Sequence, residues 1–317
     1  MTAAGARRPR RLLALALLFL AGLAAYWALQ EYRLRLAPAA DLLARLPPGA
    51  ALYAAIDLAG LRSSPQLAAA LESRLARNDA LEGLLDEPLE AAAVALEEGR
   101  ALALVAGAFE PEAVRRTVER QGGRCPGDLA KGVCTLSAGG DGWLSLRLFD
   151  GGLAIANSAN PDAADKLSAP ASAISDLAAH ANQRLRKGAV VWAHIDPARL
   201  DEAAAEPPPG WVNLSLFSRA LRQAREAQLS VEAGEPLLVE LRAACPTAED
   251  AAELGDVLSG LSSFAAALLR RQPEASDWAE ALQSFEQEVE GETLVARWQV
   301  EREALVKWLQ TSQPPEL

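Results

Sequence analysis

The longest uninterrupted apolar run in the chain covers residues 12–29 and reads LLALALLFLAGLAAYWAL. As a helix, these 18 residues would extend about 27 Å at about 1.5 Å per residue, close to the thickness of a bilayer's hydrocarbon core. Four arginines precede the run within residues 1–11, and Tyr26 and Trp27 lie near its far end. This pattern predicts a transmembrane helix with a cytoplasmic basic tail and the body of the chain outside.

The same apolar run has a second interpretation as a cleaved signal peptide. Gly22-Leu23-Ala24 offers small residues at the spacing of a cleavage site, but the apolar run continues beyond it to Leu29. We therefore expect an uncleaved anchor.

After a linker at residues 30–49, the spacing of apolar positions changes repeatedly between strand and helix periods. Residues 51–58 alternate as a strand, and Ser64-Pro65 is typical of a helix start. Residues 79–98 predict a further helix interrupted near Pro88, and residues 100–109 predict a buried strand.

Hairpins and helices alternate through the rest of the chain. Asp150-Gly151-Gly152 and Glu290-Gly291 separate pairs of apolar runs and contain the residues that tight turns require. We expect a helix over about 175–187 and another that Thr247 caps.

Two segments 139 residues apart resemble each other: residues 50–61 and 189–200 are identical at six of twelve positions without a gap. Later segments follow in the same order, with 102–114 corresponding to 238–251 and 153–167 to 294–309. The shared order predicts an internal duplication, with one repeat in 50–170 and the other in 171–317.

These elements predict an α+β protein. We expect an N-terminal transmembrane helix followed by two related α+β sandwich repeats in a ferredoxin-like style, with antiparallel sheets and helices mainly on one face. The two repeats would form separate layers side by side or one continuous sheet.

The negative net charge of the chain argues against nucleic acid as a partner. The chain has 317 residues and a formal net charge of −11, and without the four arginines of residues 1–11 the remainder carries −15. So acidic a body repels phosphate backbones, and no cluster of Lys and Arg with interleaved aromatics follows. We therefore expect no nucleic-acid binding.

The three cysteines suit an exported protein. Cys125 and Cys134 bracket the loop CPGDLAKGVC, which is able to bring two strand ends within disulfide distance in an oxidising compartment. Cys245 follows an apolar strand and is most simply a buried small side chain. We expect no metal site and no cofactor, because no metal-binding, phosphate-binding or dinucleotide-binding motif is present.

Two residues form the weak catalytic alternative. His194 and Asp196 lie two apart on a predicted strand, so their side chains point to the same side, as a shared role in a hydrolase would require. Asp57 and Asp196 recur at equivalent repeat positions, each where a strand ends and a helix begins. A shared structural role as helix N-caps explains both aspartates better than a catalytic pair does.

The face of each repeated strand that carries Tyr53 or Trp192 lies opposite the aliphatic face. Either a second layer covers these aromatic side chains or they form an exposed patch for a partner.

The stretch LPPGAALYAAIDLAGLRSSPQLAAAL, residues 46–71, resembles the opening of a domain-of-unknown-function type of bacterial envelope protein. In that family an N-terminal span precedes an LP-x-G/A, strand, D-L-x-x-L-x-x-S-P segment and related α+β repeats. The resemblance implies a location and an architecture and transfers no catalytic residue.

We therefore expect a single-pass protein of the bacterial inner membrane, with its N-terminus cytoplasmic and its body periplasmic or extracytoplasmic. Its expected role is that of a non-catalytic interaction or scaffold protein with a protein partner in the envelope. Two alternatives are a subunit of a secretion or pilus assembly platform, by analogy of fold, and a hydrolase using His194 and Asp196.

Overall fold

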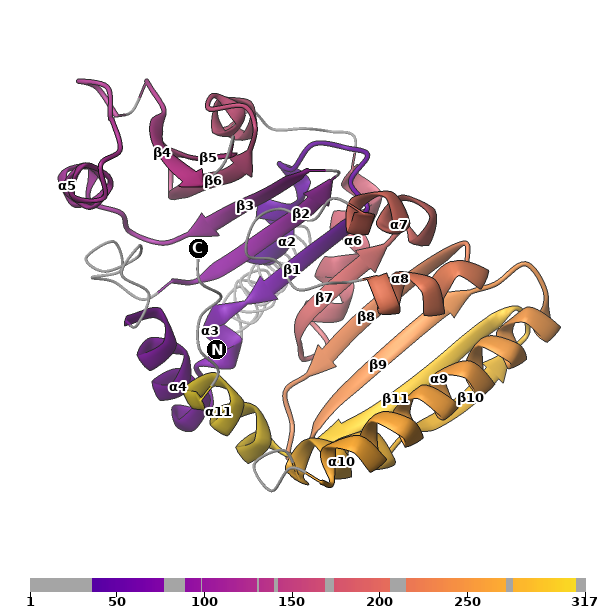
Figure 1. Cartoon of the computed structure of the whole chain (residues 1–317). Coiled ribbons are helices and arrows are strands. Elements are labelled where there is room, and N and C mark those ends of the chain that lie inside the picture. Colours follow the sequence, from indigo (N-terminus) through magenta and orange to yellow (C-terminus); the bar gives the residue numbers. More distant parts are fainter. Residues whose placement is uncertain are drawn as a thin grey trace, which may run out of the picture. The chain divides into compact units, whose positions relative to one another are not determined.

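The structure is a computed structural model, which describes residues 36–76, 89–97, 99–129, 131–139, 142–168, 174–205, 215–271 and 276–311 (Figure 1). The predicted basic tail and transmembrane helix lie outside the described residues. Residues 38–317 belong to one compact unit.

One continuous antiparallel sheet forms the centre of this unit, with the strand order β10-β11-β9-β8-β7-β1-β2-β3-β6-β5-β4. Its first six strands along the chain are β1 (Leu52–Asp57), β2 (Ala91–Glu97), β3 (Arg100–Ala106), β4 (Cys134–Gly139), β5 (Gly142–Phe149) and β6 (Gly152–Ser158). The other five are β7 (Ala189–Ile195), β8 (Glu226–Glu232), β9 (Leu237–Ala244), β10 (Glu286–Glu290) and β11 (Thr293–Val300).

Strands from the two halves of the chain meet in the middle of the sheet. β1 pairs with β7, so that Leu52 lies opposite Ile195 and Ile56 opposite Val191. The two segments that resemble each other in sequence are therefore neighbours in one sheet. Of the two arrangements left open above, the continuous sheet is the one observed.

Helices lie on both faces of the sheet, and most of the described ones lie on one face, as we expected. On the face that carries Leu52 and Ile195, the described helices are α3 (Leu58–Leu61), α4 (Pro65–Ala76), α5 (Pro111–Arg120), α7 (Pro197–Ala205), α8 (Ser215–Ala220), η3 (Leu221–Gln223), α9 (Ala248–Leu269), α10 (Ser276–Gln283) and α11 (Arg302–Thr311). The other face is covered by α2 (Pro38–Ala44), α6 (Ser175–Leu185) and η1 (Ala163–Ser168) (Figure 1).

Helix α2 occupies part of the segment that we predicted to be a linker. Pro38 suits the first turn of a helix, and Leu42 and Leu43 are buried against the sheet. A short Ala- and Leu-rich helix gains its stability from this packing rather than from its length, and a linker prediction based on the flanking prolines overlooks that contribution.

The predicted helix over 79–98 is also wrong in its last part, because residues 91–97 form strand β2. The sequence AAAVALE has high helix propensity, but β2 lies between β1 and β3 and hydrogen-bonds to both. Its side chains alternate between buried and half-buried over most of the strand. Tertiary pairing thus outweighs local propensity at this position.

Helix α9 begins with a well-formed cap. The Thr247 hydroxyl oxygen accepts a hydrogen bond from the Asp250 backbone N–H at 3.1 Å, and Glu249 and Asp250 supply negative charge to the first turn. Both features stabilise a helix N-terminus. They fix where this 22-residue helix starts on the sheet.

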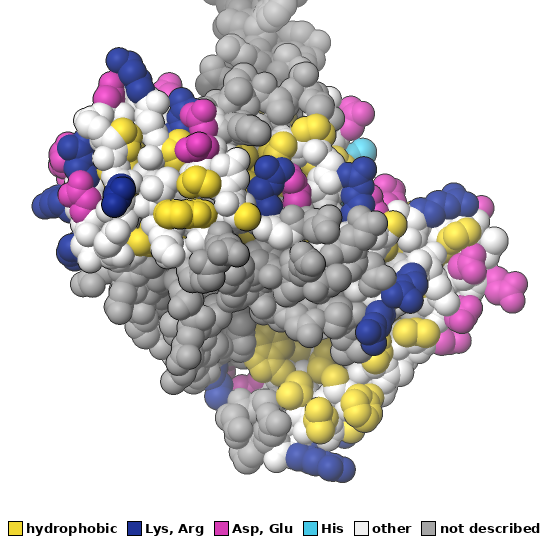
Figure 2. Space-filling view, turned by 45° about the horizontal axis from the view of Figure 1, so that its top comes forward, with side chains coloured by type: hydrophobic (Ala, Val, Ile, Leu, Met, Phe, Trp, Pro, Cys, Tyr) yellow, Lys and Arg dark blue, Asp and Glu magenta, His cyan; other side chains and the backbone are white. Residues whose placement is uncertain are grey.

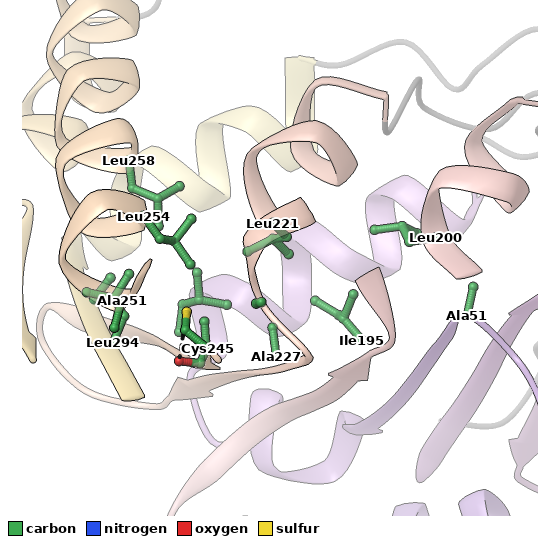
Figure 3. Packing of buried hydrophobic residues seen from close by; sticks show 14 of the residues in the cluster. Ala51, Ile195, Leu200, Leu221, Ala227, Cys245, Ala251, Leu254, Leu258 and Leu294 are labelled. Carbon is green, nitrogen blue, oxygen red and sulfur yellow. Dashed lines mark hydrogen bonds between the residues drawn. The ribbon is translucent and has the colours of Figure 1, made fainter. Parts of the chain in front are cut away.

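A large apolar core lies between α9, the α7–η3 segment and the sheet (Figure 3). Leu254 and Leu258 of α9 point toward Leu221, Ile195 and Leu294. Burying each leucine side chain contributes about 1.5–3 kcal/mol. Cys245 is part of this core and has no disulfide partner, in agreement with its expected role as a buried small side chain.

Candidate functional site

His194 and Asp196, the weak catalytic alternative, are held in different environments. Asp196 Oδ1 accepts hydrogen bonds from the backbone N–H groups of Ala198 at 3.1 Å and Arg199 at 3.3 Å. Its other oxygen lies 3.3 Å from Arg199 Nε. The carboxylate is therefore occupied in capping α7 and pairing with Arg199.

His194 is half-buried on the face of the sheet covered by α6. Its ring stacks on that of Trp192 with the centroids 6.4 Å apart, and Tyr53 and Gln228 are its cross-strand neighbours. The Nδ1 atom is buried and makes no hydrogen bond to the described residues. Burial lowers the pKa of His194 below its ordinary value of 6.5, although nearby Glu226 and Asp196 act to raise it.

Asp57 and Asp196 are too far apart to act as a catalytic pair. β1 and β7 are antiparallel, so each aspartate lies at the end of its own strand and at opposite ends of the pair. Asp196 N donates a hydrogen bond to Ala51 O, so Asp196 lies beside Ala51. Asp57 is six residues further along β1, and at about 3.3 Å per residue the two aspartates are about 20 Å apart. Asp57 Oδ1 accepts from Gly60 N at 2.9 Å and caps α3.

The aromatic side chains near the sheet centre belong to the core. Trp192 is fully buried and Tyr53 is 3% exposed, because α2 and α6 cover this face. The Tyr53 hydroxyl accepts from Ala50 N at 2.9 Å and donates to Pro47 O at 2.7 Å. Of the two interpretations of these aromatics, the covering layer is the one observed.

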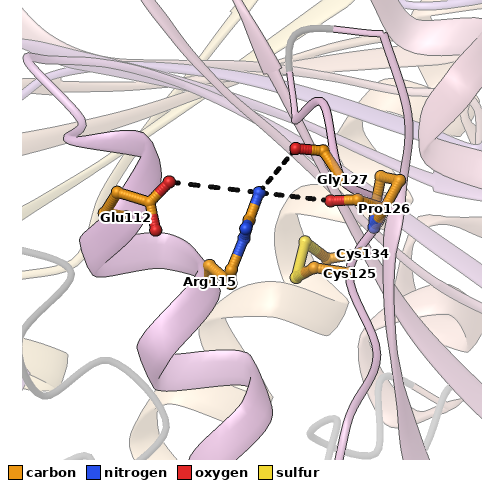
Figure 4. Close-up of a disulfide and its surroundings, with 6 residues drawn as sticks. All are labelled: Glu112, Arg115, Cys125, Pro126, Gly127 and Cys134. Atoms are coloured by element: carbon orange, nitrogen blue, oxygen red, sulfur yellow. Dashed lines mark hydrogen bonds and ion pairs between the residues drawn. A yellow bond between two sulfur atoms is a disulfide. The ribbon is translucent and has the colours of Figure 1, made fainter.

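Cys125 and Cys134 form a disulfide (Figure 4). Arg115 of α5 holds the loop between them by donating to Gly127 O at 2.8 Å and to Pro126 O at 3.3 Å. The disulfide, α5 and strands β5 and β6 enclose a small apolar core that includes Val118, Leu146 and Leu153. The bridge therefore joins the start of β4, at the edge of the sheet, to the segment that follows α5.

A polar cavity of about 750 Å³ lies where β2, β3 and β6 reach one end of the sheet. Its described lining consists of Gly49, Ala51, Glu97, Gly99, Arg100, Ser158, Ala159, Asn160 and Arg199. Arg199 connects the cavity to the α7 cap, because its guanidinium also donates to Gly49 O. The first turn of α7 thus contributes Arg199 to one wall of this cavity.

Charged groups in the cavity are held in fixed positions. Arg100 Nε donates to Glu97 Oε2 at 2.9 Å. The other carboxylate oxygen, Glu97 Oε1, is buried and makes no hydrogen bond to the described residues. A buried carboxylate oxygen without a donor is energetically costly, and because Oε1 is shielded from solvent it is not open to a ligand in the cavity.

From the sequence we did not identify the residues that line this cavity as a site. We predicted helix through residue 98, which placed Glu97 and Arg100 on unrelated elements. In the structure they flank the β2–β3 turn, where Gly99 has φ +58°. The one available signal was Gly99 itself, since a glycine between two charged residues is typical of a tight turn.

A second charged cluster, around Glu240 on β9, is saturated. Glu240 Oε1 lies 3.3 Å from Arg184 and 3.4 Å from Arg242, and Oε2 accepts from Arg297 Nε at 3.0 Å. Burial raises the pKa of Glu240, but the Arg297 hydrogen bond and the nearby arginines outweigh burial and lower it overall. Because both carboxylate oxygens are paired, we assign this cluster a structural role.

Among the described residues, no group of three or more His, Cys, Asp or Glu side chains is arranged to hold a metal ion. In that part of the chain, α9 is the one helix whose length and composition would suffice to cross a membrane. In Figure 2, charged side chains of both signs lie mainly on the described parts at the two sides of the face, and hydrophobic side chains gather on the described part toward its lower edge.

Comparisons with known proteins give a limited picture. No family model matches the sequence, and no curated protein matches it. Crystal forms I and III of TP0453 resemble the structure with TM-scores of 0.46 and 0.47 and 13% sequence identity, covering 88% and 85% of this chain and 100% and 98% of theirs. Both are mixed α+β structures, and at these scores the likeness carries no argument about function.

Proposed function

We propose that this chain is a non-catalytic interaction or scaffold protein of the bacterial envelope. In this proposal residues 12–29 hold it in the inner membrane, and the α+β body binds a partner on the extracytoplasmic side. The observation that carries the proposal is the polar cavity at the end of β2, β3 and β6, whose described lining includes Arg100, Arg199 and Asn160.

The chemistry of the cavity suits binding better than catalysis. Its described lining contains one carboxylate, Glu97, and no histidine or cysteine. Arg100 and Arg199 are restrained by ion pairs with Glu97 and Asp196, so they present fixed donors. Such a site recognises a polar segment through hydrogen bonds and charge, and it lacks the paired acid and base of a hydrolase.

The hydrolase alternative needs His194 and Asp196 to act on one reacting group. Both Asp196 oxygens already have partners, and His194 lies on the covered face of the sheet. We therefore prefer the binding function. A subunit of a secretion or pilus assembly platform is a narrower form of the same proposal.

The proposed location has two supports. The disulfide between Cys125 and Cys134 suits an oxidising compartment outside the cytoplasm. The basic residues before the apolar run at 12–29 favour a cytoplasmic N-terminus. The resemblance of residues 46–71 to single-anchored envelope proteins is in keeping with both.

We also propose that the body arose by duplication. From the centre outward, one half of the sheet runs β1-β2-β3-β6-β5 and the other runs β7-β8-β9-β11-β10. In the first half β3 is followed by α5 and strands β4, β5 and β6, and in the second β9 is followed by α9, α10 and the hairpin β10–β11; in both, the last strand returns beside the third, and β4 is an additional edge strand. Similar connectivity in two halves is the pattern that duplication produces.

The test is site-specific photocrosslinking of the full-length chain in cells. A photoreactive amino acid at Ala159, which lines the cavity and is exposed, should give a discrete adduct in the membrane fraction. The matched control position is Glu119, an exposed residue on α5, which should not give that adduct. Adding Arg199→Gln should reduce the Ala159 adduct, because this change removes a fixed donor from the cavity wall.

Identical adducts from positions 159 and 119 would contradict a binding role for the cavity. An adduct that Arg199→Gln leaves unchanged would contradict it as well. Recovery of the intact chain in the soluble fraction would contradict the anchor.

A further inference from the structure

Strand β10 is an edge of the sheet with an open side. Among the described residues it is the last strand beyond β11, and all five of its residues are exposed. The two-residue turn after Glu290 makes Glu290 and Thr293 a hydrogen-bonded pair. By the alternation of an antiparallel ladder, the backbone N–H and C=O groups of Gln287 and Val289 then point away from β11. An open row of such groups is a template for a further strand.

The opposite edge of the sheet is partly covered. There the backbones of Arg124 and of Thr135 on β4 exchange hydrogen bonds, both at 2.8 Å. The disulfide between Cys125 and Cys134 lies next to this pair and holds it. Figure 1 shows β4 and β10 at opposite ends of the sheet. The two edges therefore differ, because no described segment covers β10 in this way.

The first half of the sheet has a strand in the position that is open beyond β10. In the proposed duplication β10 corresponds to β5, the strand at the same distance from the centre. Strand β4 pairs with the outer side of β5, with Leu136 opposite Leu144 and Cys134 opposite Leu146. In the second half, no described strand takes this place. The pairing of β4 with β5 thus shows how a strand from another chain would add to β10.

The open edge is strongly acidic. Residues 248–256 of α9, which contacts β10, and residues 286–292 of β10 and its turn contain four acids each and no Lys or Arg. Three of these acids pair with an arginine: Glu290 with Arg242 at 2.5 Å, Glu288 with Arg297 at 3.5 Å and Glu292 with Arg225 at 3.9 Å. Helices α8 and η3, which also contact α9, add one arginine each. The acids stay in excess, so the edge favours a basic partner.

The same charges argue against a second copy of the chain as the added strand. Two β10 strands paired antiparallel about Glu288 would place Glu286 opposite Glu290 of the second copy, and Glu288 opposite itself. Like charges directly opposite each other in a sheet are destabilising. A strand with Lys or Arg at alternate positions would replace this repulsion by attraction.

We propose that β10 binds an extended segment of another envelope protein, rich in Lys or Arg, which adds to the sheet as one more strand. Backbone hydrogen bonds to Gln287 and Val289 would hold the segment. Its basic side chains would meet the glutamates of β10 on one face and the acids of α9 on the other. The proposal takes its geometry from the proposed duplication. It adds a second contact to the proposed binding function, in the half of the sheet that does not contain the cavity.

The test uses the full-length chain in a nonionic detergent and a fluorescent synthetic peptide that alternates lysine and threonine. Fluorescence anisotropy measures the binding of this peptide. One control peptide has glutamate in place of lysine. A second control keeps every lysine but has methyl groups on its backbone nitrogens, so its charge is the same and it has no donor for a strand ladder. We expect the lysine peptide to bind severalfold more tightly than either control.

Two variants of one residue test the same contact from the side of the protein. Val289→Pro removes an outward N–H group and leaves the hydrogen bonds between β10 and β11 in place, whereas the matched control Val289→Ala keeps that N–H group. We expect Val289→Pro to weaken binding of the lysine peptide severalfold and Val289→Ala to weaken it much less. Thermal unfolding shows whether each variant is folded, and the methylated peptide tests the same hydrogen bonds on the unchanged chain.

Equal binding of the lysine peptide and its methylated form would overturn strand addition, because charge alone would then explain the binding. Equal binding of the lysine and glutamate peptides would overturn the basic partner. Self-association of the chain that Val289→Pro abolishes would make a second copy the occupant and would overturn the proposal as well. Crosslinking at Ala159 reports on the cavity alone, so a failure of that test is distinguishable from a failure of this one.

Discussion

Ala54 of β1 lies directly opposite Ala193 of β7 in the antiparallel register of the two strands. These alanines also occupy the same position in the matching segments 50–61 and 189–200. A half-turn about an axis between them therefore exchanges β1 with β7. The same rotation exchanges Val94, the other neighbour of Ala54, with Leu229, the other neighbour of Ala193. This relationship is the strongest support for our proposal of duplication.

The two aspartates of the repeat should contribute to stability and not to chemistry. Asp196→Ala removes two hydrogen bonds to the first turn of α7, and we expect it to lower the free energy of unfolding by about 1 kcal/mol. Asp196→Asn keeps a capping oxygen and should lower the free energy of unfolding by less than Asp196→Ala does. Chemical denaturation measures the free energy of unfolding of both variants. If Asp196→Ala left stability unchanged and abolished partner binding, the capping assignment would be wrong.

The two sides of α9 should respond differently to the same substitution. Leu254 is fully buried in the core, so Leu254→Ala should cost about 2–5 kcal/mol through lost burial and a residual cavity. Leu268 is half exposed, and Leu268→Ala should change the free energy of unfolding by less than about 0.5 kcal/mol. Equal losses in denaturant titrations would show that Leu268 is part of the core.

Folding stability should depend on pH through His194. Burial lowers its pKa below 6.5, so the unfolded chain binds a proton at a pH where the folded histidine is still neutral. The stabilisation is complete above pH 6.5 and is lost as the pH falls toward the lowered pKa, with a slope of at most about 1.4 kcal/mol per pH unit.

His194→Gln should remove this part of the pH dependence, whereas the matched control Gln228→Ala, at the cross-strand neighbour of His194, should retain it. The measurement is the free energy of unfolding between pH 5 and pH 8, a range set by the ordinary histidine pKa. An unchanged slope in His194→Gln would refute the assignment.

The disulfide should stabilise the outer part of the sheet. It closes a short loop, with Cys125 and Cys134 nine residues apart. On the loop-entropy estimate, replacing both cysteines by serine should cost about 2–3 kcal/mol. Thermal unfolding of the double variant under oxidising conditions should match that of the reduced wild-type chain. If reduction leaves the wild type unaffected, the bridge is not a stabilising element.

Short-range signals were enough to locate several features. Asp-Gly and Glu-Gly pairs indicated the turns at Gly151 and Gly291, where the structure has positive φ. A residue that caps a helix acts on its own neighbours, so the roles of Asp57, Asp196 and Thr247 follow from local sequence. The similarity of the two strands around Ala54 and Ala193 also indicated where the halves correspond.

Features that depend on distant contacts were not predictable in the same way. Residues 91–97 have the composition of a helix, and only their pairing with β1 and β3 makes them a strand. The cavity brings together Gly49, Glu97, Asn160 and Arg199, which are widely separated in the sequence. The helices on both faces likewise follow from α2 and α6 packing behind the sheet, which no local pattern specifies.

We propose that residues 12–29 anchor the chain and that the body lies outside the cytoplasm. The most direct test is proteinase K treatment of spheroplasts from cells that express the chain with an N-terminal epitope tag, followed by non-reducing gel analysis of Cys125 and Cys134. We predict that the added protease removes the body, that the tag remains protected in the membrane fraction, and that the two cysteines are oxidised beforehand. A body that stays intact until the inner membrane is permeabilised, with both thiols reduced, would contradict the claim.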